Sequence, residues 1–407
     1  MSLPLTQTKQ TSIWKNKSFA ILVISTFLIS VANKIYELLL PLIIYELTHS
    51  PVAVSSMRTA ELLPNLLFGI FIGVIVDRVQ KRKWAMWMVG GQALLLLAMV
   101  QLIRLDVGLL FPYYVIGFLL MTLNYGYFNA QVSLTKLTVP REQMTSANAK
   151  FSFIETFVGV MGPVISGLIL LLPFLYDGIL ITALAYFLCF VLLTQLTSSQ
   201  ESFADRKKST FTEDFLEGWK SFRGNKPLWL MTIFIAVMNC SMTVVSTTAV
   251  IYAKEELAMT SAAVASIMAF AGIGGLAGSL IVNKLRQIVG LGIVFGTSSL
   301  IFAIAYIGMF FAHDVKLLAV SLFLSGFALA LYTVSAYTFR LEQTPAELIG
   351  RISGITGTLF RVGMPLTMYV SGWMVLWWGA DSVFLSSAFL NIVVYLIFVR
   401  TILWQIK

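Results

Sequence analysis

The chain alternates long apolar runs with short polar segments from about residue 18 to residue 404. Each run has about 20 residues, the length that an α-helix needs to cross the hydrocarbon layer of a membrane. The runs lie at about 18–45, 52–76, 84–103, 109–133, 147–172, 179–197, 228–252, 261–282, 289–311, 316–338, 352–376 and 382–404. This pattern predicts an all-α integral membrane protein with twelve transmembrane helices.

The composition excludes a water-soluble globular protein. Of the 407 residues, 58% are hydrophobic and 12% are charged, and the mean hydropathy is +0.86. A soluble domain carries about 25% charged residues. The first apolar run follows Lys9, Lys15 and Lys17, but it is too long for a signal peptide and has no small-residue cleavage site. We therefore expect it to remain as the first helix.

The basic residues predict the orientation of the chain. The formal net charge is +9, but the Lys and Arg residues are dispersed in short clusters between the apolar runs, so we expect no nucleic-acid partner. Of these 28 residues, 22 fall on the side that holds both termini. Because cytoplasmic loops carry an excess of Lys and Arg, the sequence predicts a multi-pass protein of the cell membrane with both termini in the cytoplasm.

The longest polar stretch, Thr197 to Lys226, divides the chain nearly in half. Its segment from Phe211 to Phe222 is amphipathic, and such a helix lies at the membrane surface. We therefore expect an N-terminal six-helix bundle over residues 1–197, a cytoplasmic linker over 198–226 and a C-terminal six-helix bundle over 227–407. We expect the protein to be a monomer in the lipid bilayer.

The two halves resemble a duplication. At an offset of 206 residues Asn33 aligns with Asn239, and at an offset of 205 residues Pro140 aligns with Pro345. Two six-helix bundles related by an axis along the membrane normal are a known plan of transporters, in which the substrate site lies between the bundles. The sequence therefore predicts two bundles with pseudo-two-fold symmetry.

A motif follows the second predicted helix. It contains Gly73, Asp77, Arg78, Lys81 and Arg82. The motif resembles the signature between helices 2 and 3 of the major facilitator superfamily, although a glycine is usual at position 80, where this chain has a glutamine. The resemblance implies the major facilitator fold, and it implies that these five residues form a conformational lock on the cytoplasmic side. The alternative is that the basic residues serve only as a topology signal.

A second motif lies in the fifth predicted helix and consists of Gly159, Gly162, Pro163 and Gly167. Small residues permit close helix contacts and proline bends a helix, so packing alone also explains this motif. Similar patterns in helix 5 mark the antiporters of the superfamily. Together with segments 40–48, 135–148 and 343–352, the chain resembles the drug:proton antiporter branch that includes macrolide efflux pumps and the enterobactin exporter.

Six ionisable side chains lie inside the predicted spans, where each costs at least a few kcal/mol. They are Lys34, Glu37, Arg58, Glu61, Glu155 and Arg361. Lys34 and Glu37 are three residues apart on one helix, as are Arg58 and Glu61, so each pair can form a salt bridge. Either these pairs are inert, or the three glutamates are candidates for proton coupling with the basic residues as charge partners. We favour Glu155, because no charged residue lies within one helical turn of it.

The cargo surface is predicted from the resemblance, because helices 1, 4, 7 and 10 line the central cavity of that family. The candidates on these helices are Asn33, Asn124, Tyr127, Gln131, Asn239 and Tyr332. Aromatic walls with a few hydrogen-bonding groups suit amphiphilic molecules. Packing between helices is the alternative explanation for each of these residues.

These observations predict a secondary active transporter that exports amphiphilic, drug-like or toxin-like small molecules by proton antiport with alternating access. No phosphate-binding glycine loop is present in the sequence, so we expect the proton gradient as the energy source and no cofactor. A dedicated siderophore or metabolite exporter is the alternative. An intramembrane enzyme or a receptor is a remote one, since His49 and His313 lie at span ends and no metal-ligand spacing is present.

Overall fold

The structure, a computed structural model, describes residues 13–140, 143–169, 174–196, 211–344 and 348–406, and within these ranges it contains helices and no strands. The α-helices are α1 (Lys17–Thr48), α2 (Pro51–Arg78), α3 (Lys81–Arg104), α4 (Phe111–Thr138), α5 (Met144–Ile169), α6 (Leu175–Thr194), α7 (Phe211–Gly224), α8 (Lys226–Glu255), α9 (Ser261–Val289), α10 (Leu291–Phe310), α11 (Val315–Gln343), α12 (Ile349–Leu359), α13 (Met364–Trp378) and α14 (Ala380–Phe398). Short 3-10 helices cover Ile13–Lys15 and Ile402–Gln405. The predicted all-α class is confirmed.

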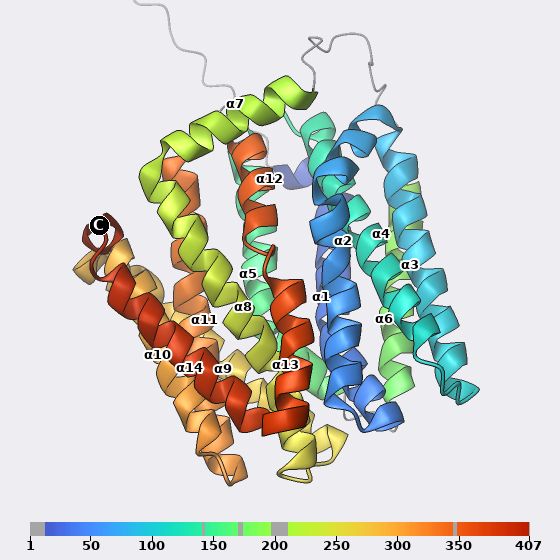
Figure 1. The fold of residues 1–407 in the computed structure, drawn as a ribbon. Helices are drawn as coiled ribbons and strands as arrows, with labels where there is room; N and C mark the ends of the chain where they lie inside the picture. The colour runs from blue at the N-terminus through green and yellow to red at the C-terminus, as the bar shows by residue number, and fades with distance from the viewer. Residues whose placement is uncertain (1–12, 141–142, 170–173, 197–210, 345–347, 407) are drawn as a thin grey trace, which may run out of the picture.

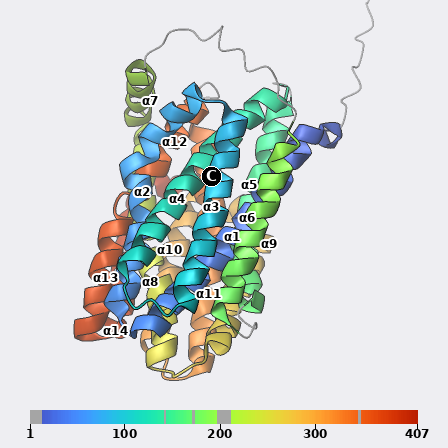
Figure 2. The ribbon, with the colours of Figure 1, turned by 90° about the vertical axis from the view of Figure 1, so that its right-hand side faces the viewer.

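The helices are arranged in two bundles. The first bundle contains α1 to α6 and the second contains α8 to α14, while α7 runs across one end of the molecule (Figure 1 and Figure 2). We call this end the linker side and the opposite end, where α1 and α8 finish, the far side. Since α12 and α13 follow one another along a single span, each bundle supplies six spans, in agreement with the twelve apolar runs.

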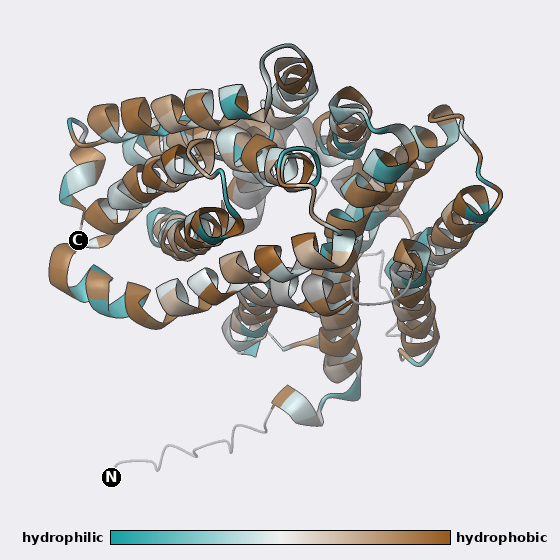
Figure 3. Cartoon of the chain, turned by 90° about the horizontal axis from the view of Figure 1, so that it is seen from below, coloured by the Kyte–Doolittle hydropathy of each residue, from teal (hydrophilic) through white to brown (hydrophobic). Residues whose placement is uncertain are grey.

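The outer surface of the bundles is apolar. Nine helical spans in the described part of the chain are long and apolar enough to cross a membrane. Large side chains such as Trp87, Leu94 and Phe389 are exposed, and hydrophobic residues cover most of the helices (Figure 3). Such a surface is suited to contact with lipid chains rather than water.

On the far side, polar side chains cap the N-terminal ends of α2, α9 and α11. The Ser50 hydroxyl accepts a hydrogen bond from the backbone of Ala53, and Pro51 occupies the first position of α2. Thr260 caps α9 and Asp314 caps α11 in the same way. A side-chain oxygen at this position satisfies a backbone N–H that the helix leaves unpaired. Polar residues between the apolar runs therefore help to fix where α2, α9 and α11 begin.

The span predicted at 352–376 is broken in its middle. Helix α12 ends at Leu359 and α13 begins at Met364, with an irregular turn between them. Pro365 lies in the first turn of α13, where proline is tolerated because the N–H that it lacks would have no helical partner. The carbonyl of Phe360 accepts a hydrogen bond of 2.9 Å from Asn239 on α8. A side chain of a neighbouring helix therefore binds backbone that the break leaves free.

The predicted amphipathic linker segment forms α7. The ring of Trp219 lies 6.1 Å from Phe215 and 5.9 Å from Phe222, and Phe222 lies 5.3 Å from Trp229 of α8. This aromatic packing holds α7 against the beginning of α8, and α7 also contacts α12. Residues 197–210 lie outside the described residues, so the domain boundaries at 198 and 226 stay a prediction.

Candidate transport site

Four charged side chains of α1 and α2 form a continuous charge chain in the first bundle. Lys34 Nζ lies 2.6 Å from Glu37 Oε2, and Arg58 Nη1 lies 2.8 Å from Glu61 Oε2. These are the two pairs that the spacing predicts. Arg58 Nη2 also lies 3.2 Å from Glu37 Oε1, which joins the pairs. The chain holds two positive and two negative groups, all of them in the same bundle.

The chain leads from accessible to buried surroundings. The Lys34 and Glu37 side chains are 38% and 44% exposed, whereas Arg58 and Glu61 are 10% and 2% exposed. A buried carboxylate requires a cation to compensate its lost hydration. Arg58 supplies that cation to Glu61 inside the bundle.

Gly162 of the helix 5 motif lies against Lys34. A Cβ atom at Gly162 would lie 2.9 Å from Cγ of Lys34 and 3.1 Å from its Cβ, whereas a Cβ at Gly159 would meet nothing within 4 Å. Gly162 therefore leaves room for the stem of Lys34, and Gly159 does not serve that purpose. Pro163 and Gly167 belong to α5, and their side chains lie outside the described ones.

A second group of polar side chains gathers between the bundles, and we call it the inter-bundle cluster. It consists of Tyr125, Glu155, Tyr337, Arg340 and Arg361. Arg361 Nη1 donates a hydrogen bond of 3.1 Å to the Tyr125 hydroxyl, which joins the α12–α13 break to α4 of the other bundle. The Arg340 guanidinium lies 4.8 Å from the Tyr337 ring. Glu155 lies within electrostatic reach of Arg340 and Arg361.

Three side chains of the inter-bundle cluster are accessible. Glu155 and Arg361 are exposed, and Tyr337 is 45% exposed. Polar side chains at such depth in a membrane protein face the interior or a water-filled cavity. The cluster therefore has the position that a transport site between two bundles requires.

Arg340 is a member of this cluster that the sequence analysis missed. Arg340 lies beyond the apolar run predicted at 316–338, but α11 continues to Gln343 and carries Arg340 in its last turn. Hydropathy does not show how far a helix extends beyond its apolar run. The available signal was the spacing of three residues between Tyr337 and Arg340, because residues at this spacing lie on one face of a helix.

The two asparagines that the repeat aligns occupy equivalent positions. Asn33 Oδ1 accepts hydrogen bonds from Asn124 Nδ2 at 2.7 Å and from the Tyr186 hydroxyl at 2.5 Å. Asn239 Oδ1 accepts a hydrogen bond of 2.7 Å from the Tyr332 hydroxyl. Each asparagine thus joins the first helix of its bundle to the fourth, α1 to α4 and α8 to α11. These four cargo candidates make contacts between helices of one bundle.

The remaining cargo candidates on α4 point into the first bundle. Tyr127 has no exposed surface, and the buried Gln131 donates to the Thr135 hydroxyl of its own helix. The α4 residue that faces the other bundle is Tyr125. Two residues along an α-helix correspond to a rotation of about 200°, so the predicted face of α4 lies opposite the observed one.

The lock candidates are placed only in part. Gly73, Asp77 and Arg78 belong to the last turns of α2, and their side chains lie outside the described ones. Lys81 is buried and donates to a backbone carbonyl of the preceding turn. Arg82 Nε donates to the Leu193 carbonyl at 3.3 Å, at the C-terminal end of α6, where a cation is favoured. A role for these residues as a lock stays a prediction.

The two bundles are joined at the far side by a group that we call the far-side clasp, formed by Glu46, Lys254 and Ser261. Lys254 Nζ lies 3.0 Å from Glu46 Oε1 and 2.6 Å from the Ser261 hydroxyl, and that hydroxyl also contacts Glu46. Glu46 belongs to α1, whereas Lys254 and Ser261 belong to α8 and α9. Helix α13 also packs closely on α2, as Gly372 shows: a Cβ atom at this position would overlap the Ser55 hydroxyl.

Comparison with known proteins identifies the family. The sequence profile of the Major Facilitator Superfamily matches residues 22–291 and 234–405. The chain belongs to the major facilitator superfamily. No match of comparable significance was found among curated protein sequences.

Solved structures of transporters share this fold. A mutant of the nucleoside transporter NupG superposes with a TM-score of 0.75 at 15% identity, covering 94% of this chain and 98% of that one. A bacterial homologue of the iron transporter ferroportin in an inward-facing state gives 0.69 at 15% identity, covering 96% and 100%. A POT family transporter in complex with 5-aminolevulinic acid gives 0.71 at 13% identity, covering 95% and 96%.

Family membership and fold together make this chain a secondary transporter with two six-helix bundles. The predicted superfamily and fold are confirmed. At 13 to 15% identity the likeness to solved structures shows the fold alone, so cargo and coupling ion have to be argued from this chain's own residues.

Proposed function

We propose that this transporter exports amphiphilic small molecules in exchange for protons, with Glu155 as the residue that carries the proton. One observation supports the proposal. The cationic partners of Glu37 and Glu61 lie in the same bundle as these carboxylates, whereas those of Glu155 lie in the other bundle. Alternating access proceeds largely by rigid-body rocking of one bundle against the other around a fixed site. Contacts inside a bundle therefore persist through the cycle, while contacts between bundles change.

Glu37 and Glu61 have their cations inside their own bundle. Lys34 and Arg58 lie on α1 and α2, as the two carboxylates do. Rocking leaves these distances unchanged, so the charge chain is expected to stay ionised and paired throughout transport. It stabilises the first bundle and does not drive coupling.

Glu155 belongs to α5 of the first bundle, whereas Arg340 and Arg361 belong to the second. A nearby cation favours the ionised form of a carboxylate, and its withdrawal favours the protonated form. Rocking changes this separation, so Glu155 binds a proton when the arginines are distant and releases it when they approach. A residue with this property is what an antiporter requires.

The chemistry of the inter-bundle cluster favours amphiphilic cargo. Tyr125, Tyr337 and Phe360 provide aromatic faces around the charged groups, and pockets of this kind bind molecules with apolar bodies and polar groups. The two arginines outnumber the one carboxylate described in the cluster. This excess of positive charge supports a second candidate function, the export of an acidic siderophore or metabolite.

The test uses the full chain in proteoliposomes with an imposed pH gradient and three fluorescent probes. Dansyl ethylenediamine, dansyl amide and dansyl glycine carry positive, zero and negative charge on the same aromatic body. We expect uphill movement of at least one probe with protons moving the opposite way. Glu155→Gln should abolish this proton-driven movement while probe-for-probe exchange continues.

Glu342→Gln provides the control, because Glu342 forms a surface ion pair with Arg286 inside the second bundle. This variant should transport at the wild-type rate. Proton-driven movement that survives in Glu155→Gln would remove Glu155 from the mechanism. Movement that follows an imposed sodium gradient and ignores the pH gradient would contradict proton coupling altogether.

A further inference from the structure

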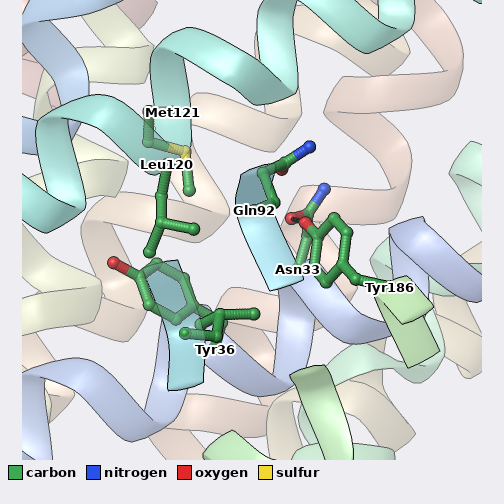
Figure 4. Close-up of a pocket in the computed structure, with 7 residues that line it drawn as sticks. Asn33, Tyr36, Gln92, Leu120, Met121 and Tyr186 are labelled. Atoms are coloured by element: carbon green, nitrogen blue, oxygen red, sulfur yellow. Dashed lines mark hydrogen bonds between the residues drawn. The ribbon is translucent and has the colours of Figure 1, made fainter. Parts of the chain in front are cut away.

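The first bundle contains a small cavity that belongs neither to the charge chain nor to the inter-bundle cluster. Its volume is about 10 Å³. The cavity lies between α1, α3, α4 and α6 (Figure 4). It is lined by Asn33, Tyr36, Gln92, Leu96, Leu120, Met121 and Tyr186.

Two polar atoms of the lining residues lack a hydrogen-bond partner among the described residues, the Tyr36 hydroxyl and Gln92 Oε1. Gln92 is 1% exposed, and its Nε2 donates to the Met88 carbonyl of its own helix at 3.1 Å. Its Oε1 is buried and accepts no hydrogen bond from the described part of the chain. Leaving a buried acceptor unpaired is unfavourable, and such groups in proteins are regularly satisfied by ordered water.

Asn33 supplies a complementary donor. Its Oδ1 already accepts hydrogen bonds from Asn124 and Tyr186, so both lone pairs are used and the amide N–H groups remain. The amide groups of Gln92 and Asn33 lie beside one another at the cavity (Figure 4). Gln92 can therefore accept a hydrogen bond and Asn33 can donate one.

We propose that one ordered water molecule occupies this cavity, donating a hydrogen bond to Gln92 Oε1 and accepting one from Asn33 Nδ2. A volume of about 10 Å³ is about the least that one water molecule requires, and the water needs polar partners, which the amides of Gln92 and Asn33 supply in a lining that is otherwise mostly apolar. The water joins α3 to the junction at which Asn33 connects α1, α4 and α6. It thereby helps the first bundle to move as one body.

The lining favours water over a sodium ion. No carboxylate lines the cavity, and hard cations in proteins prefer several oxygen ligands that include carboxylates. The Asn33 oxygen is already engaged by two donors, which leaves it unable to bind a cation without losing them.

The first test is the sign of the stability change in Gln92→Leu, measured as the thermal midpoint of the full-length protein in detergent. If the cavity is dry, leucine removes an unsatisfied acceptor and the midpoint rises. If water is bound, leucine removes its partner and the midpoint falls, which is the result we expect. Replacing sodium chloride by choline chloride should leave the wild-type midpoint unchanged. A sodium-dependent rise that Gln92→Leu abolishes would overturn the proposal in favour of a cation.

The second test is synchrotron hydroxyl-radical footprinting, in which bound water modifies the side chains beside it. Tyr36 and Tyr186 are each 3% exposed and line the cavity, whereas Tyr113 and Tyr306 are 0% and 1% exposed and lie elsewhere. We expect the first pair to be modified several-fold faster than the second in the wild-type protein. Equal rates for all four tyrosines would overturn the proposal, even if Gln92→Leu fails to fold.

Discussion

Glu155 and Glu61 show how the surroundings of a single residue decide what a buried carboxylate can do. Glu61 is 2% exposed and lies 2.8 Å from an arginine of its own helix. Glu155 is exposed to the space between the bundles, and its arginines come from the other bundle. Under the proposed mechanism, the same side chain is therefore a fixed structural charge in one place and a switchable one in the other.

Gly162 is the residue at which the smallest change should have a measurable effect. Gly162→Ala places a methyl group against the Cβ and Cγ atoms of Lys34, which are close to the backbone and move less easily than the end of the side chain. Overpacking of this kind costs about 1–3 kcal/mol. We expect a lower thermal midpoint and slower transport, because the Lys34–Glu37 pair has to shift.

The matched control is Gly159→Ala on the same helix, where a new Cβ meets nothing within 4 Å. Alanine is a better helix former than glycine by about 1 kcal/mol, so this variant should be as stable as the wild type or more stable. Equal effects of the two substitutions on thermal midpoint and transport rate would show that Gly162 serves only general flexibility of α5.

The break between α12 and α13 is the element whose geometry brings Arg361 to Tyr125. Asn239→Ala removes the donor to the Phe360 carbonyl and leaves the Tyr332 hydroxyl without its acceptor. Unpaired buried polar groups cost about 1–3 kcal/mol. We therefore expect faster hydrogen exchange of the amides at 360–364 and slower transport.

Tyr332→Phe separates the two contacts of Asn239. It removes the hydrogen bond between the hydroxyl and Asn239 Oδ1 but leaves the bond from Asn239 to the break. Exchange at 360–364 should stay close to that of the wild type in this variant. If Asn239→Ala exchanges no faster than Tyr332→Phe, Asn239 does not hold the break.

Contacts within one helix were predictable from the sequence, and contacts between helices were not. The spacing of three residues was enough to pair Lys34 with Glu37. The predicted face of α4 carries Tyr127, whereas Tyr125 contacts Arg361 of the other bundle. Polar and aromatic side chains lie on both sides of this helix, so the polar pattern alone does not show which face meets the other bundle. The break in the span predicted at 352–376 was not predicted either, and the Phe360 carbonyl at this break accepts a hydrogen bond from Asn239, which lies on another helix.

At the scale of the whole molecule, the far-side clasp joins α1 of the first bundle to α8 and α9 of the second. In alternating access the bundles have to separate on this side during part of the cycle, so the contacts of Glu46 with Lys254 and Ser261 must break and re-form. The energy of the clasp then contributes to the equilibrium between far-side-closed and far-side-open states.

Removing one charge of the clasp should shift this equilibrium by a predictable amount. Glu46 is 44% exposed and Lys254 is 12% exposed at the side chain. An accessible ion pair is worth about 0.2–1 kcal/mol, which corresponds to a population change of about 1.5- to 5-fold. Glu46→Gln and Lys254→Gln should each raise the far-side-open population by a factor in this range.

Cys240 is a native reporter for that population. It is half-buried on α8 beside the α12–α13 break, whereas Cys189 is buried. In a Cys189→Ser background, a membrane-impermeant thiol reagent applied from the far side should label Cys240 about 1.5- to 5-fold faster in either clasp variant.

The exchanged pair Glu46→Lys with Lys254→Glu should restore the slow rate, because it re-forms the attraction with its charges reversed. Glu342→Gln, which breaks an ion pair within the second bundle, should not change the labelling. If all these variants label at the wild-type rate, the clasp does not hold the far side closed, and the close packing of Gly372 on Ser55 has to account for the closure alone.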